Sequence, residues 1–150
     1  MGKNRTVLGM TLILVGILGS AYALSSQWLI QNNGIVHTRG IEAFWHQNLT
    51  LPVTRIDWPT LFPGQTTSVS AWVHNPGNSP ILVSMRTENW SPAEASVFID
   101  VQWDREAARL EGRETLQVNF TLHVSQAVVN ATVLIEHYSF DIWVTAADAP

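Results

Sequence analysis

Acidic side chains are the first candidates for chemistry in this sequence, because two carboxyl groups across a cleft can hydrolyse a glycosidic bond. The acids nearest to one another are Asp100, Asp104, Glu106, Glu111 and Glu114. They fall at the ends of expected strands and in a charged loop, where a carboxylate stays solvated, whereas the reaction requires one carboxyl with a raised pKa. The sequence also contains no glycine-rich phosphate loop and no nucleophile elbow. We therefore expect no enzymatic activity.

Histidine and cysteine are the usual ligands of transition metals, and their pattern here does not predict a metal or cofactor site. The histidines are His37, His46, His74, His123 and His137. None forms a closely spaced ligand pair, although two on neighbouring strands can still meet in space; surface histidines at strand edges are the expected interpretation. The absence of cysteine excludes a disulfide, a thiolate nucleophile, a zinc ribbon and a blue-copper site.

Asparagine-x-serine/threonine motifs are candidate glycosylation sites, which would mark an exported surface. Beyond the first 23 residues the acceptors are Asn48, Asn89, Asn119 and Asn130. Pro92 follows the motif of Asn89 and makes it the weakest of the set. Chance occurrence is the alternative, because asparagine and threonine are common in exported β-proteins.

The first 23 residues have the pattern of a secretory signal peptide: Lys3 and Arg5, an apolar run, and a small-residue end with Ala23 as the predicted cleavage site. The alternative is a retained membrane-anchor helix, since no charged side chain occurs between Arg5 and Arg39. In both cases the positive flank keeps the N-terminus in the cytoplasm and the rest is exported. The net charge of −4 gives no basic surface for nucleic acid.

Alternation of apolar and polar residues predicts the elements that position these side chains. The turn at Pro63-Gly64 precedes a run in which Val69, Ala71 and Val73 share one face. Similar runs predict strands over residues 35–45, 53–58, 66–74, 81–88, 97–103, 116–124 and 138–145. We also expect a helical turn at 106–110 and a bulge or bend within 130–137. About seven strands with regular turn signals predict an all-β, immunoglobulin-like antiparallel β-sandwich over 35–150, preceded by the hydrophobic helix and a linker or donor segment, 24–34.

The same alternation places three aromatic side chains on the outer faces of the strands, namely Trp72, Phe98 and Trp143. Together they could form a contact patch for another protein or a stacking surface for a sugar ring. The alternative is that the core, or the segment near the membrane, covers them.

Two stretches, Leu61-Phe-Pro-Gly-Gln and Val73-His-Asn-Pro-Gly-Asn-Ser-Pro-Ile, resemble immunoglobulin-like surface domains related to the CARDB-type modules. Further short stretches resemble uncharacterised archaeal exported proteins with one such sandwich; they are Ile56-Asp57-Trp58, Asn89-Trp90-Ser91-Pro92, Val101-Gln102-Trp103 and Ser139-Phe140-Asp141-Ile142. This resemblance implies the fold and export, and it implies no particular chemistry.

We therefore expect a non-catalytic, exported or membrane-tethered module that acts by protein contact, with Trp72 and Trp143 as the main contact residues. Its partner would be another surface protein or a second copy of the chain. One alternative is a filament subunit in which residues 24–35 leave their own sandwich and add a strand to a neighbour. A second alternative is a small module that binds glycans through its surface tryptophans.

Overall fold

The computed structural model describes residues 30–131 and 135–150. The predicted signal peptide or anchor helix, its cleavage site at Ala23, and residues 24–29 lie outside this part. Among the described residues, no helix is long and apolar enough to cross a membrane.

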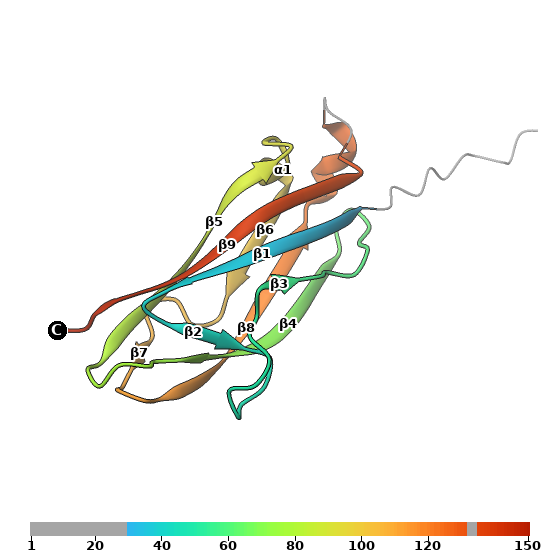
Figure 1. Ribbon diagram of the computed structural model, residues 1–150. Helices are drawn as coiled ribbons and strands as arrows, with labels where there is room; N and C mark the ends of the chain where they lie inside the picture. The colour runs from blue at the N-terminus through green and yellow to red at the C-terminus, as the bar shows by residue number, and fades with distance from the viewer. Residues whose placement is uncertain (1–29, 132–134) are drawn as a thin grey trace, which may run out of the picture.

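The described part is built mostly of β-strands in two layers (Figure 1). The strands are β1 (Gln31–Arg39), β2 (Glu42–Phe44), β3 (Arg55–Ile56), β4 (Thr66–His74), β5 (Ile81–Ser91), β6 (Ile99–Trp103), β7 (Arg109–Leu110), β8 (Thr115–Val124) and β9 (His137–Asp148). The described residues also contain a short helix, α1 (Ala95–Phe98), and a 3₁₀-helix, η1 (Gln126–Asn130). One sheet has five strands in the order β3-β1-β9-β5-β7, and the other has four in the order β2-β4-β8-β6. The predicted all-β sandwich is confirmed.

The core lies between the two sheets and is rich in aromatic side chains. Phe120 of β8 and Phe140 of β9 are among its largest fully buried residues. The Trp103 ring lies 6.0 Å from that of Phe120, and the Trp90 ring stacks on Phe140 at 4.4 Å, both measured between centroids. Each aromatic can bury roughly 150–250 Å². Because the chain has no cysteine, this core and the strand ladders hold the fold without disulfides.

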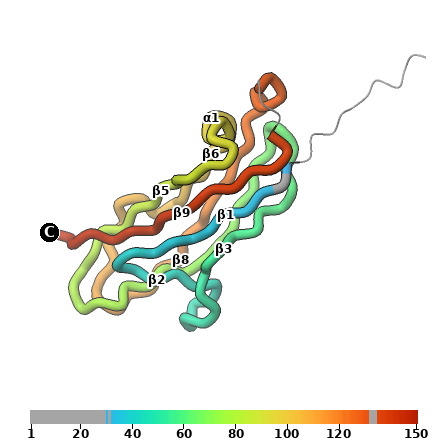
Figure 2. The backbone as a smooth tube through the Cα atoms, turned by 45° about the horizontal axis from the view of Figure 1, so that its top comes forward, coloured from blue at the N-terminus to red at the C-terminus, as the bar shows by residue number. Residues whose placement is uncertain are grey.

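The strand β1 departs from the prediction of a purely antiparallel sandwich. It runs parallel to β9, in a register that places Gln31 opposite His137, and Figure 2 shows the two strands side by side. The predicted start of the sandwich at residue 35 is also wrong, because Ile30 is fully buried and forms a bridge with Leu61. Pairing of β1 with β9 joins residues far apart in the sequence, and local alternation carries no information about it.

The predicted first strand, residues 35–45, is divided between the two sheets. Gly40 has a φ of +74°, a conformation that glycine adopts without steric penalty. It turns the chain from β1 in the five-stranded sheet to β2 in the four-stranded sheet. Ile41 and Ala43 are both buried, as their shared face predicted.

Other differences from the prediction surround α1 and β7. Residues 97 and 98 belong to α1 instead of a strand. The backbone N–H groups of residues 95, 96 and 97 each donate to the carbonyl three residues earlier, starting with that of Pro92, and these bonds form a helical turn. The helical turn expected at 106–110 is a turn followed by β7. A bulge occurs in β5 between Glu88 and Ser91; within 130–137 the described residues show η1 ending at Asn130.

Candidate functional site

The three aromatics expected at a contact surface do not form one patch. Trp143 lies on the outer face of β9 in the five-stranded sheet, and Trp72 on the outer face of β4 in the four-stranded sheet. Trp72 stands between Phe44 and Gln117 of the neighbouring strands. Phe98 is in α1 and packs against the core. The prediction of a joint patch is wrong, because the two sheets of the sandwich separate its members.

Trp143 is nevertheless the centre of a well-organised group of side chains. The strand register places His37 of β1 on one side of Trp143 and Arg86 of β5 on the other. The His37 ring stacks on the indole with 4.5 Å between centroids and 19° between planes. Arg86 Cζ lies 5.4 Å from the indole centroid, within cation–π range. We call His37, Trp143 and Arg86 the tryptophan stack.

Charged and polar groups around the tryptophan stack pair with one another. Asp141 Oδ2 lies 3.4 Å from His37 Nε2 and accepts a hydrogen bond from Asn89 Nδ2 at 2.7 Å. Arg86 Nε donates to Glu88 Oε1 at 2.5 Å. Partly exposed pairs of this kind contribute little to stability. With these pairs the outer face of the sheet presents a surface of mixed charge around Trp143.

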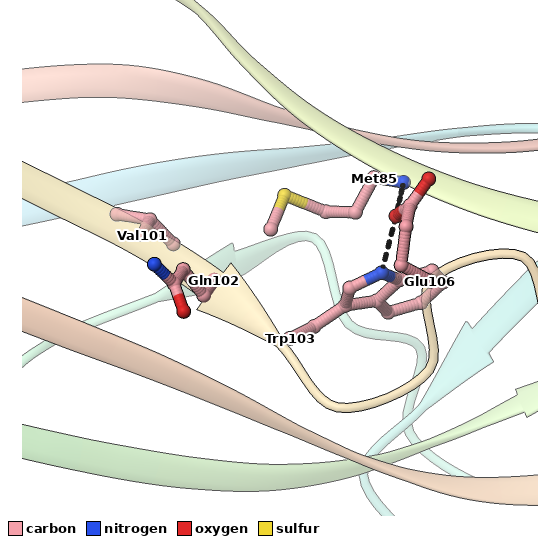
Figure 3. A pocket seen from close by; sticks show the side chains of 5 residues that line it. All are labelled: Met85, Val101, Gln102, Trp103 and Glu106. Carbon is pink, nitrogen blue, oxygen red and sulfur yellow. Dashed lines mark hydrogen bonds between the residues drawn. The ribbon is translucent and has the colours of Figure 1, made fainter.

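A groove opens on the side of the sandwich where β5 and β6 lie across from each other (Figure 3). Met85, Val101, Gln102, Trp103 and Glu106 line a volume of about 340 Å³. The Met85 backbone N–H donates to Glu106 Oε2 at 3.0 Å, and Trp103 Nε1 donates to the same oxygen at 2.7 Å. Met85 and Trp103 belong to different sheets, so this one carboxylate links the two layers at the groove.

The groove borders a free strand edge. Within the described chain β6 is hydrogen-bonded to β8 on one side and is the last strand of its sheet. An exposed edge of this kind is a potential site for an added strand. The sequence did not predict the groove. Glu106 was expected in a helical turn, and local alternation of apolar and polar residues carries no information about contacts between sheets.

Two of the acids considered for catalysis, Asp104 and Glu111, pair with neighbouring side chains. Asp104 accepts hydrogen bonds from the backbone N–H and Nδ2 of Asn119 at 2.9 and 2.8 Å. Burial raises the pKa of Asp104, but these hydrogen bonds and the nearby Arg105 outweigh it and hold the pKa below its usual value. A general acid requires the opposite shift. Glu111 pairs with Arg109 at 2.8 Å. In the described ranges no group of three or more His, Cys, Asp or Glu side chains could hold a metal ion.

Two of the candidate glycosylation sites are exposed and lie away from the tryptophan stack. Asn48 is in the loop between β2 and β3, and its Oδ1 accepts a hydrogen bond from Thr50 of its own motif at 2.6 Å. Asn130 is exposed at the end of η1, while Thr132 of its motif lies outside the described residues. Both asparagines are exposed among the described residues.

The other two candidates are engaged by neighbouring side chains. Asn89 is exposed, with a φ of +54°, but its amide donates to Asp141. Asn119 is half-buried, accepting from Ser70 Oγ at 2.6 Å and donating to Asp104. A glycan on either would require these hydrogen bonds to break.

Comparison with known proteins gives no family. No family model matches the chain, and no curated protein matches it in sequence. Among solved structures, the ASH/PapD-like domain 7 of human CEP192 is similar over 74% of this chain and 85% of that domain, with 10% sequence identity and a TM-score of 0.38. A likeness at this level carries no conclusion about function, and the resemblance to archaeal CARDB-type proteins stays a prediction.

Proposed function

We propose that this chain is a non-catalytic, exported module that binds another protein through the tryptophan stack. The observation that carries the proposal is that Trp143 lies on an outer face, outside the core cluster, yet is held between His37 and Arg86. Tryptophan and arginine are enriched among the residues that dominate binding energy at protein interfaces. Holding them in place before contact lowers the entropy lost on binding.

A photo-reactive amino acid at Thr145, the next outward position of β9, tests this proposal in native cells. We expect a covalent adduct of defined mass that is lost when Trp143→Ala is added. The same label at Thr121, on the outer face of the other sheet, is the matched control and should give no adduct that depends on Trp143. Equal adducts at both positions, or an adduct at Thr145 that Trp143→Ala leaves unchanged, would overturn the proposal.

Glycan binding has weaker support from the geometry. A sugar ring stacks on an open aromatic face, whereas the two residues that flank Trp143 come from both neighbouring strands and cover the indole. We therefore expect tryptophan fluorescence to stay unchanged when polysaccharides are added. Quenching that disappears in Trp143→Ala or Trp72→Ala would favour a carbohydrate-binding module instead.

Export is supported by the sequence pattern of residues 1–23 and is part of the same proposal. The intact mass of the protein from its native membrane fraction would report both cleavage after Ala23 and glycans on the four candidate asparagines. We expect either the cleaved chain or a full chain that stays with the membrane on the outer side. Full-length protein in the cytosolic fraction would contradict export.

A further inference from the structure

The strand β1 occupies an unusual position in its sheet, between β3 and β9, and we call this position its seat. It forms the one parallel pairing among the described strands, beside β9, while every other strand pair is antiparallel. Parallel pairing is slightly less stable per residue than antiparallel pairing. On its other side β1 pairs with the short strand β3 at two positions, Gly34 and Ile35. Flanking backbone hydrogen bonds on the same side join Val36 to Thr54 and Ile30 to Leu61.

The inward side of β1 contributes little to the core. Ile30, just before the strand, and Val36 are buried apolar residues, but Asn32 and Gly34 lie between them on the same side. The Asn32 side chain has buried amide atoms with no hydrogen-bond partner in the described structure, and the same is true of the hydroxyl of Tyr138, its neighbour in register. Burial raises the pKa of the Tyr138 hydroxyl, and the nearby Asn32 side chain opposes this effect. The two groups nevertheless do not reach hydrogen-bonding geometry. These unpaired polar groups lower the stability of β1 beside β9, although the ladder between the two strands covers nine residue pairs.

The inner face of β9 next to β1, in contrast, must be shielded from solvent. Tyr138, Phe140 and Ile142 of β9 are buried side chains on the inner face, and β1 lies next to them, between β9 and the edge strand β3. The seat is also narrow: a Cβ at Gly34 would lie 3.3 Å from a Phe140 ring carbon and 3.4 Å from Ile142 Cδ1. Glycine at this register avoids the crowding, and β1 of a second copy carries it.

The connection that follows β1 can act as a hinge. Gly40 and Ile41 separate β1 from β2, which is in the opposite sheet, and Gly40 supplies the backbone freedom that such hinges require. A change at Gly40 can therefore swing β1 away while β2 stays paired with β4.

We propose that β1 is exchanged between copies of this chain, so that β1 of one molecule occupies the seat beside β9 of another. Exchange of an identical element retains the native contacts and is a low-cost route to assembly. Reciprocal exchange gives a closed dimer, and head-to-tail exchange gives an open chain of subunits. The inference goes beyond the proposed function, since it requires no contact by Trp143, and each can fail without the other.

Disulfide trapping tests the exchange, because the chain has no cysteine of its own. Asn33 and Ser139 are opposite each other on β1 and β9, on the outer face. Two full-length variants with different tags, Asn33→Cys and Ser139→Cys, are purified separately in detergent, mixed at high concentration and oxidised. We expect a disulfide-linked heterodimer between the two tags, in severalfold excess over either homodimer.

The matched control uses Ser68→Cys and Thr121→Cys, which are opposite each other on β4 and β8, two interior strands of the other sheet. These variants should give no excess of heterodimer. A heterodimer yield for Asn33→Cys and Ser139→Cys that only equals this control would overturn the proposal. The double variant Asn33→Cys/Ser139→Cys, oxidised when dilute, shows whether both substitutions are compatible with the fold, because it should form the disulfide within one chain.

Discussion

At the scale of one residue, the buried and unpaired amide of Asn32 on β1 lowers the free energy of unfolding. A buried polar group without a partner costs about 1–3 kcal/mol, and leucine has nearly the same shape as asparagine without its polar atoms. Asn32→Leu should therefore raise the free energy of unfolding, measured by urea denaturation, by about 1–3 kcal/mol. Asn33→Leu, at the next position on the outer face, is the control and should change it by less than about 0.5 kcal/mol. A loss of stability in Asn32→Leu would show that the amide has a partner after all.

Asp104 gives the fold a dependence on pH that can also be traced to one side chain. Its pKa in the folded protein lies below the ordinary value of 3.8, so the folded state favours the charged carboxylate. The stabilisation is fully present above the unfolded-state pKa and is lost as the pH falls through the lower, folded-state pKa. The free energy of unfolding should thus fall less steeply below pH 4 in Asp104→Asn than in the unchanged chain. Asp148→Asn removes the same charge from the exposed end of β9 and controls for the change in net charge.

At the scale of elements, Glu106 substitutes for a missing strand at the edge of β5. The backbone N–H of Val83 donates to the carbonyl of Ala108, but the next outward N–H, that of Met85, donates to the Glu106 carboxylate. In Glu106→Ala we expect amide hydrogen exchange at Met85 to accelerate, while exchange at Val83 changes little. The exposed Glu94, whose side chain makes no capping bond to α1, provides the control Glu94→Ala. Unchanged exchange at Met85 would show that Glu106 does not protect this edge.

The elements that local alternation defines are the ones the sequence predicts well. The strand β4 has the expected bounds, Thr66–His74, because its apolar and polar residues alternate between two clear turns. The same rule placed Trp143 on an outer face. It could not supply His37 and Arg86, because they reach Trp143 through the register of three strands distant in sequence. The sequence placed Phe98 on the outer face of a strand, because the alternation of apolar and polar residues in β6 extends by chance back into α1.

At the scale of the whole molecule, the strands should differ in how readily they open. The ladder between β4 and β8 is antiparallel, interior to its sheet and flanked by fully buried side chains, so its amides should exchange only on global unfolding. Amides of β1 should exchange faster under the same conditions, through an opening that leaves the rest of the sandwich folded. Hydrogen-exchange mass spectrometry of the two segments measures this difference. Equal rates would mean that β1 is an inseparable part of one cooperative unit.

The pairing of β1 with β9 also sets an order of events during synthesis. A ribosome makes β1 early, but its partner in the sheet follows about a hundred residues later. Until β9 emerges, β1 can pair within its own chain only with the short strand β3, whereas a finished neighbour already has a β9. The time at which two nascent copies meet can therefore determine whether they end as separate molecules or as an assembly.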